Sequence, residues 1–366
     1  MARSTRLAPA SAGVAAALLA ASLVVAVPAG AARPSAASHF ATPSSIASTG
    51  PWIAVSNRAS STLTLLAAKG GTILRTVSHA LLGIAAPTAI VAEPISGRRI
   101  AFVGGTGGAV AELSLTARGA GVAVARLRVL RPAGCAARAV SLLALDAHGH
   151  LVEACGNGVV TEWAAATGAL VRTIPASTTH LTNATGLAIL GVSAYVTNAA
   201  TSAPGTAPDS VTELSLATGA RVRSITNATS ATYAFSAPSG IASDGTHLWE
   251  ANAKGNTVDE LAGGTLALLG SSGTNLTAPA AVLATPKFVW VSSATVNGSS
   301  SMVTQFYVVN NQIESPWMMC NSNGPYQFGN PSGFAMHGGM LWVANAANNL
   351  IDQMNGSSGA LAGTYT

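Results

Sequence analysis

The stretch from Val160 to Ile174 reads VTEWAAATGALVRTI, and the stretch from Val211 to Ile225 reads VTELSLATGARVRSI. The two segments are copies of one another with little distortion, so the chain contains an internal repeat. Shorter copies of the first four residues occur at Leu63-Thr-Leu-Leu66, Val110-Ala-Glu-Leu113, Val258-Asp-Glu-Leu261, Val303-Thr-Gln-Phe306 and Ile351-Asp-Gln-Met354. The repeat therefore organises most of the chain.

A second element precedes each copy and is richest in Trp, Tyr, Val and Asn. Its members are Ile53-Ala-Val-Ser-Asn57, Ala101-Phe-Val-Gly-Gly105, Leu151-Val-Glu-Ala-Cys155, Ala194-Tyr-Val-Thr-Asn198, Leu248-Trp-Glu-Ala-Asn252, Val289-Trp-Val-Ser-Ser293 and Leu341-Trp-Val-Ala-Asn345. Their mean spacing of about 48 residues is typical of propeller repeats. Each repeat contains four alternating apolar runs separated by Gly, Asn and Ser turns, which indicates a four-stranded antiparallel blade. We therefore predict an all-β fold, a seven-bladed β-propeller over residues 44–366 with simple end-to-end closure.

The composition excludes several classes of protein. Hydrophobic residues make up 49% of the 366 residues and charged residues only 8%, with a net charge of +5. Such a chain is neither disordered nor a coiled coil, and it lacks the basic patches of a nucleic-acid-binding domain. Basic residues gather in 33–140 and acidic residues from 141 onward. This asymmetry either favours an acidic partner such as a cell-wall polymer or is surface drift without a function.

The first residues of the chain have the pattern of a secretory signal. Arg3 and Arg6 precede the apolar run Gly13–Val27, and small residues at 29–31 form a cleavage site. The alternative, an uncleaved membrane anchor, needs roughly 20 apolar residues, more than this run has. We expect residues 1–31 to be a signal peptide, 32–43 a flexible linker, and the mature chain to be a secreted, extracellular monomer that is not inserted in a membrane.

The repeats resemble a known class. Tyr195-Val-Thr-Asn198 and Leu341-Trp-Val-Ala-Asn345 are similar to the YVTN/NHL-type bacterial β-propeller repeats, over essentially all of 44–366. The resemblance implies a β-propeller and extends distantly to streptogramin B lyase-like propellers, which use a divalent metal with His and carboxylate groups near the channel. A typical repeat of those lyases resembles Trp-Phe-Thr-Glu followed by Asn-x-Ile-Gly-Arg. Here Glu250 stands one or two positions earlier than the Glu of that motif, and no Gly-Arg follows Val258 or Ile351.

Comparison between the copies separates scaffold positions from candidate sites. A Glu or Gln column in the third strand recurs in most blades and is interpreted as scaffold: Glu112, Glu162, Glu213, Glu260, Gln305 and Gln353. The Trp and Tyr column is interpreted as packing between blades. Glu153 and Glu250 instead interrupt a column of Val, and buried carboxylates of this kind are either satisfied structural groups or parts of a site. His150 and His247 lie three residues earlier, on the opposite face of the strand.

The loops that enter the blades supply the other candidate ligand-binding residues. Tyr233 and Phe235 precede blade five, and the segment 314–332, predicted to be a long loop before blade seven, contains Trp317, Met318, Tyr326 and Phe328. Such a loop either builds a binding surface or packs its own aromatic rings for stability. The insertion 199–209 in blade four is polar.

The three cysteines suit an exported protein. Cys135 precedes the first strand of blade three and Cys155 ends its second strand, so we expect these two to form a disulfide and Cys320 to be a free thiol. The sequence thus favours a secreted, non-enzymatic scaffold without a cofactor, binding a protein or cell-wall glycan through its loop-rich face. The alternative is a propeller-type lyase or lactonase that depends on a divalent cation.

Overall fold

The computed structural model describes residues 39–136, 139–202, 206–294, 301–309, 312–320 and 324–366, with the side chains of 312, 314, 315 and 320 left aside. Residues 1–31, the predicted signal peptide, lie outside this range. Among the described residues, no helix is long and apolar enough to cross a bilayer.

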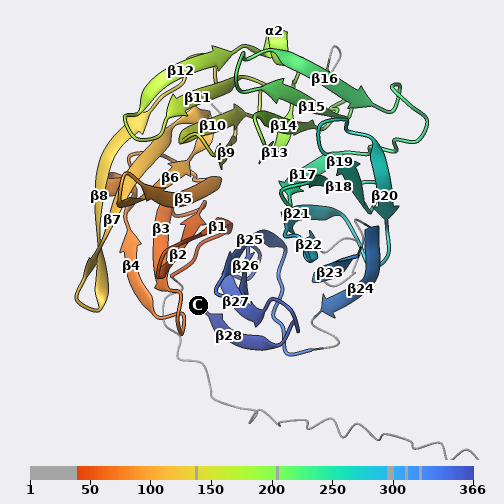
Figure 1. Ribbon diagram of the computed structural model, residues 1–366. Coiled ribbons are helices and arrows are strands. Elements are labelled where there is room, and N and C mark those ends of the chain that lie inside the picture. The colour runs from red at the N-terminus through yellow and green to blue at the C-terminus, as the bar shows by residue number, and fades with distance from the viewer. Residues whose placement is uncertain (1–38, 137–138, 203–205, 295–300, 310–311, 321–323) are drawn as a thin grey trace, which may run out of the picture. The chain divides into compact units, whose positions relative to one another are not determined.

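Seven four-stranded antiparallel sheets form a ring, so the predicted seven-bladed β-propeller is confirmed. In every sheet the strands follow one another in chain order, and Figure 1 shows the first strand of each blade innermost and the fourth outermost. The strands are β1 (Pro43–Thr49), β2 (Trp52–Asn57), β3 (Thr62–Ala67), β4 (Ile73–Val77), β5 (Ala89–Ile95), β6 (Arg98–Gly104), β7 (Val110–Arg118), β8 (Gly121–Leu130), β9 (Ser141–Leu145), β10 (His150–Cys155), β11 (Val160–Ala164), β12 (Ala169–Ile174), β13 (Ala184–Leu190), β14 (Ser193–Asn198), β15 (Ser210–Ser215), β16 (Arg221–Thr226), β17 (Pro238–Ser243), β18 (His247–Asn252), β19 (Thr257–Ala262), β20 (Leu268–Ser272), β21 (Pro279–Ala284), β22 (Phe288–Ser293), β23 (Met302–Val309), β24 (Gln312–Cys320), β25 (Pro331–His337), β26 (Met340–Asn345), β27 (Leu350–Asn355) and β28 (Leu361–Tyr365). The short helices are α1 (His79–Leu82), α2 (Ala176–Thr179) and the 3-10 turn η1 (Thr106–Gly108).

This meander gives the ring two distinct faces. The chain enters each first strand, and leaves each second strand, on one face, which we call the entry face. The turns between strands one and two, and between strands three and four, lie on the opposite face. The disulfide and the histidine clusters described below each belong to one of these two faces.

The second strands are the core of the molecule because both of their faces are covered by neighbouring blades. Every residue of β2, β14 and β18 is buried. Trp249 of blade five packs with Val289 and Val291 of blade six, and Trp290 of blade six packs with Leu341 and Val343 of blade seven. The aromatic column therefore packs between blades, as the repeats indicate.

The pairing of third and fourth strands has an irregularity at the same place in all seven blades. In six blades the register shifts directly after the Glu or Gln column, for example between Glu162 and Trp163 or between Glu260 and Leu261, and in blade one it shifts after Leu65 at the same position. Such a β-bulge twists the outermost strand and makes its free edge a poor template for pairing with another chain. The bulge is thus part of the repeat.

The ring closes between blade one and blade seven without exchange of a strand, as predicted. Ser332 in β25 donates through its Oγ to the carbonyl of Pro43, the first residue of β1, at 2.6 Å. Four other blades make the same kind of hydrogen bond, from a hydroxyl at the start of one inner strand to a carbonyl at the start of the next blade, at 2.6–3.0 Å: Ser44 to Pro87, Thr88 to Ser141, Thr185 to Pro238 and Ser239 to Pro279. Pro87 and Thr88 directly precede β5. Leu142 and Ala280 occupy this position in blades three and six.

The segment 314–332 differs from the prediction of one long loop. Its first part belongs to β24, the outermost strand of blade six, where Trp317 pairs with Gln305. Proline is tolerated on an edge strand because the missing N–H faces no partner, and Pro316 occupies such a place. The prediction that Trp317 and Met318 lie in a loop is therefore wrong, whereas Tyr326 and Phe328 do lie in the connection to blade seven.

Candidate functional site

Glu153 is fully buried near the entry face of blade three. Its Oε1 accepts a hydrogen bond from Ser141 Oγ at 2.7 Å, and its Oε2 accepts one from Thr161 Oγ1 at 3.3 Å. Burial raises the pKa of Glu153 to about 7, while the two hydroxyls oppose that rise. The carboxyl therefore lies close to the balance between its neutral and its charged form at neutral pH.

Glu250 is the corresponding group of blade five and is also fully buried. Asn252 Nδ2 donates to Glu250 Oε2 at 2.7 Å and to Asp259 Oδ2 at 3.1 Å. Burial, and then the neighbouring charge of Asp259, raise the pKa of Glu250 well above its usual value. Because neither Glu153 nor Glu250 reaches the surface, their assignment as ligand-binding residues stays a prediction.

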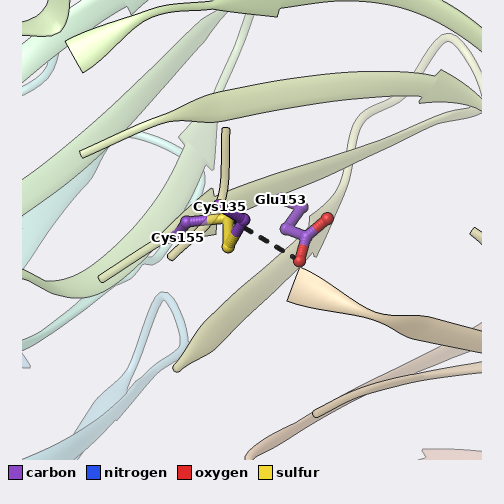
Figure 2. A group of neighbouring side chains, drawn as sticks. All are labelled: Cys135, Glu153 and Cys155. Atoms are coloured by element: carbon purple, nitrogen blue, oxygen red, sulfur yellow. Dashed lines mark hydrogen bonds between the residues drawn. A yellow bond between two sulfur atoms is a disulfide. The ribbon is translucent and has the colours of Figure 1, made fainter. Parts of the chain in front are cut away.

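Cys135 and Cys155 form a disulfide at the entry face of blade three, with their Cα atoms 5.8 Å apart. Figure 2 shows Glu153 beside the disulfide. Glu153 Oε1 lies 4.0 Å from Cys155 Sγ. Because a disulfide sulfur has no proton to donate, this contact is not a hydrogen bond. The side chain of Cys320, the predicted free thiol, lies outside the described residues.

The disulfide replaces a hydrogen bond that other blades make at the same point. In four blades the second strand ends in Asn, whose Oδ1 accepts a backbone N–H of the segment entering the blade: Asn57, Asn198, Asn252 and Asn345. Blade three has Cys155 at this position, and its bond to Cys135 joins the entering segment covalently. The disulfide is therefore part of the way in which the entry face is built.

The predicted aromatic ligand-binding residues pack mainly on their own blades. Tyr233 and Phe235 stack with ring centroids 5.4 Å apart, and Tyr233 donates to the carbonyl of Leu266. Tyr326 and Phe328 stack at 5.1 Å. Phe235 and Phe328 are buried, which supports the alternative that these rings stabilise their loops.

Trp317 and Met318 belong to a strand and not to these loops. Trp317 is 40% exposed on β24, the outer edge of blade six, and Met318 is half-buried beside it. The Trp317 ring lies against Gly359, whose carbonyl accepts a hydrogen bond from Tyr326, so these two residues are neighbours, whereas Tyr233 and Phe235 pack in blade five.

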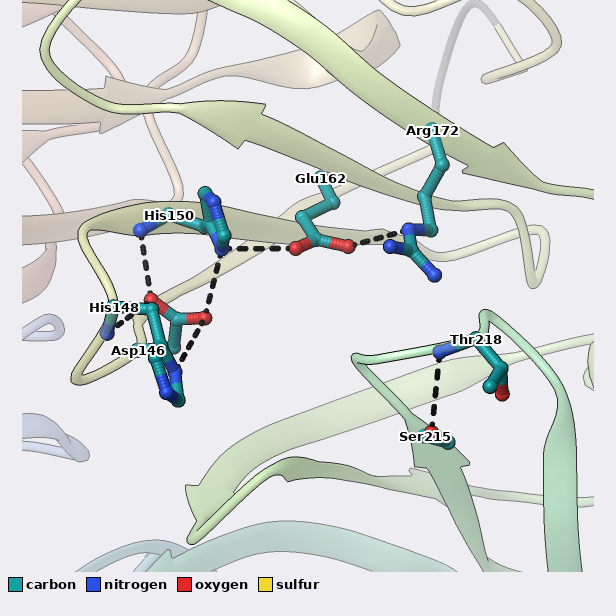
Figure 3. Close-up of polar contacts among 7 residues, drawn as sticks. All are labelled: Asp146, His148, His150, Glu162, Arg172, Ser215 and Thr218. Carbon is teal, nitrogen blue, oxygen red and sulfur yellow. Dashed lines mark hydrogen bonds and ion pairs between the residues drawn. The ribbon is translucent and has the colours of Figure 1, made fainter.

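A cluster that the sequence did not reveal lies on the opposite face of blade three (Figure 3). His150, at the start of β10, places its Nδ1 3.0 Å from Asp146 Oδ2 and 3.0 Å from Glu162 Oε1. Arg172 Nε lies 2.7 Å from the other oxygen of Glu162. Burial raises the pKa of Glu162, and Arg172 and then His150 oppose that rise. His150 is thus paired with Glu162 of the next strand and not with Glu153.

The Glu column is a set of cross-strand ion pairs in blades two, three and four. The distances from Arg Nε to Glu Oε2 are 2.9 Å for Arg128 and Glu112, 2.7 Å for Arg172 and Glu162, and 2.9 Å for Arg223 and Glu213. The sequence contained the signal for two of them, since both long copies of the repeat carry Arg ten residues after Glu. The scaffold interpretation of this column agrees with these contacts.

Blade five has the same Glu and a similar His but lacks the arginine. His247 Nδ1 lies 3.5 Å from Asp244 Oδ2 and 3.6 Å from Glu260 Oε1, and Gly270 stands opposite Glu260 where blade three has Arg172. Burial, and then the charge of Asp244, raise the pKa of Glu260 to about 7. This carboxyl therefore lacks the cation that its equivalents possess.

The central channel offers hydroxyl and backbone groups. A cavity of about 370 Å³ is lined by the inner strands of all seven blades, and no described residue of its lining is ionisable. A second cavity of about 300 Å³ lies at the entry face beside Arg58 and Ser332. Arg58 is exposed and is the charged residue of this second lining.

Comparisons with known proteins identify the fold. No protein-family model and no curated protein matches this chain. The crystal structure of Chaetomium thermophilum Raptor is similar, with a TM-score of 0.64 and 13% identity over 86% of this chain and 28% of the Raptor chain. A chain in the crystal structure of a mitotic checkpoint complex is also similar, with a TM-score of 0.60 and 12% identity over 85% of this chain and 87% of that chain. At such low identity these likenesses show a shared β-propeller fold alone.

Proposed function

We propose that this chain is a secreted, non-enzymatic β-propeller of the YVTN/NHL type, which acts as a monomer and binds a protein or cell-wall glycan through its entry face. The observation that carries the proposal is the absence of ionisable groups among the described residues lining the central channel. A lyase or lactonase that works through a metal near the channel needs His and carboxylate ligands there. Hydroxyl and backbone groups suit recognition better than acid–base chemistry.

The chemistry of the entry face favours an anionic partner. Arg58 stands exposed beside the cavity at this face, and Arg131, also exposed, follows β8 in the connection on the same face. A positive surface raises the rate at which an acidic polymer binds. The Cys135–Cys155 disulfide, which persists in oxidising compartments, supports secretion.

Binding to a soluble acidic glycan tests the proposal. The purified chain is titrated with polygalacturonate, and with dextran as a neutral polymer. We expect binding to the acidic polymer that weakens as salt is added. The substitution Arg58→Glu should reduce the affinity about tenfold, because it places a negative charge beside the cavity.

Arg118→Glu is the matched control. Arg118 is also exposed but is the last residue of β7, beside the turn to β8 on the opposite face. The substitution Arg118→Glu makes the same change of net charge as Arg58→Glu. An equal loss of affinity in both variants would therefore point to general charge attraction and would contradict a site on the entry face. Dextran binding as strong as that of the acidic polymer would contradict the charge argument.

A photocrosslinker placed at position 58 or 118 tests the same face for a protein partner. The cross-linked chain is recovered from the medium of the producing cells. We expect a discrete adduct from position 58 only.

A further inference from the structure

The cluster of Asp146, His150 and Glu162 has the geometry of a metal-ligand set. One ligand atom from each residue, Asp146 Oδ2, His150 Nδ1 and Glu162 Oε1, lies within 4.8 Å of the other two. The nitrogen is 3.0 Å from both oxygens. Ligand atoms that each lie about 2.0–2.2 Å from one cation are separated by about 3 Å, so these distances need little adjustment.

The second oxygen of each carboxylate is already held by another group. Asp146 Oδ1 accepts the backbone N–H of His148 at 2.9 Å and that of His150 at 2.7 Å. Glu162 Oε2 faces Arg172 Nε. The remaining oxygen of each carboxylate is therefore turned toward the imidazole. Partners that orient the ligands in this way are typical of metal sites.

The charges of the cluster also favour a cation. The carboxylates of Asp146 and Glu162 are both buried, and Arg172 is the one guanidinium that the structure places against them. Two negative charges and one positive charge leave one negative charge in a buried place, which is costly unless it is paired. A divalent cation or a proton on His150 supplies the missing charge.

Access distinguishes blade three from the similar group in blade five. The side chain of His150 is 31% exposed, and a cavity of about 300 Å³ lies between the cluster and the turn of blade four at Leu216 and Ala217. In blade five the side chain of His247 is only 9% exposed, and Trp249 Nε1 donates to Asp244 Oδ2 at 2.9 Å. The indole N–H of Trp249 is thus hydrogen-bonded to Asp244 Oδ2, the oxygen that a metal ion would need as a ligand.

A fourth ligand is available in the same turn. His148 Nδ1 lies 3.8 Å from Asp146 Oδ2, and the side chain of His148 is 62% exposed and so able to rotate. Two imidazoles and two carboxylates form a set of two nitrogens and two oxygens. Imidazole nitrogen favours zinc-like cations over Mg²⁺ and Ca²⁺, which prefer oxygen ligands.

We propose that Asp146, His150 and Glu162, with His148 as a fourth ligand, bind one Zn²⁺-like divalent cation on the face opposite the entry face. The cation replaces a proton on His150 Nδ1, so the imidazole keeps its other proton on Nε2. It joins the turn between β9 and β10 to β11. This site is independent of the proposed partner-binding function.

Calorimetric titration of the purified chain with ZnCl₂ tests the site. The disulfide is kept oxidised, and Cys320→Ser removes a thiol that could bind zinc elsewhere. We expect one equivalent of Zn²⁺ to bind, and Co²⁺ to give the visible absorption of a site with nitrogen and oxygen ligands. His150→Gln and Glu162→Gln should each lower the affinity at least tenfold.

Two matched variants control for the substitutions themselves. Glu213→Gln removes the Glu of the corresponding ion pair in blade four, and His247→Gln removes the His of blade five. Both should leave the affinity unchanged. An affinity that survives His150→Gln, the absence of stoichiometric binding, or equally tight binding of Ca²⁺ would each overturn the proposal.

Discussion

Glu260 is the residue whose surroundings differ most from those of its copies, because it is buried without an arginine. Its pKa of about 7 in the folded protein compares with an ordinary value of 4.5. As the pH rises from 4.5 to 7, the unfolded chain loses this proton first, so the free energy of unfolding falls by about 3 kcal/mol and then levels off. Glu260→Gln should remove this loss. The variant should therefore match the parent chain in free energy of unfolding at pH 4.5 and exceed it at pH 8. Urea unfolding at several pH values measures it, and an unchanged pH slope would contradict the prediction.

The missing arginine can be introduced by substitution at Gly270, the residue paired with Glu260. A Cβ on Gly270 would meet its nearest neighbour, Glu260 Oε2, at an ordinary 3.8 Å, so the position has room for a side chain. Gly270→Arg should reproduce the pair of Arg172 with Glu162 and raise the free energy of unfolding at pH 8 by about 1–3 kcal/mol. The same substitution in a Glu260→Gln background is the control, and a gain that persists there would show that charge pairing is not its cause.

At the scale of elements, the disulfide of blade three takes the place of an Asn hydrogen bond. It closes a loop of 20 residues, so its removal should cost about 3 kcal/mol. Cys135→Ser with Cys155→Asn should recover about 1 kcal/mol relative to the double serine variant, because the introduced amide would face Glu153 as Asn252 faces Glu250. Thermal unfolding of the two double variants makes the comparison. Equal stabilities would mean that the Asn column does not act alike in every blade.

The pairing of β10 with β11 shows why the sequence predicts strands better than sites. Strand periodicity correctly placed His150 and Glu153 on opposite faces, but the partner of His150 depends on register. Val152 pairs with Glu162, so Glu162 lies diagonally beside His150 on the same face. No pattern within one strand contains that information. The strand β24 was missed for a local reason, since Pro316 and the adjoining apolar run hide its alternation.

At the scale of the whole molecule, the ring depends on seven similar interfaces between inner strands, two of which lack the shared hydroxyl. Ala280→Ser in blade six would place an Oγ where Ser239 donates to the next blade at 2.6 Å, now facing Pro331. Since closure couples every blade to its neighbours, the added bond should raise the stability of the whole ring by about 0.5–1 kcal/mol, and Ser239→Ala should lower it by a similar amount. Urea unfolding of both variants decides the matter. A loss for Ser239→Ala without a gain for Ala280→Ser would mean that blade six holds its neighbour by packing alone, and that the hydroxyl ring is complete with five members.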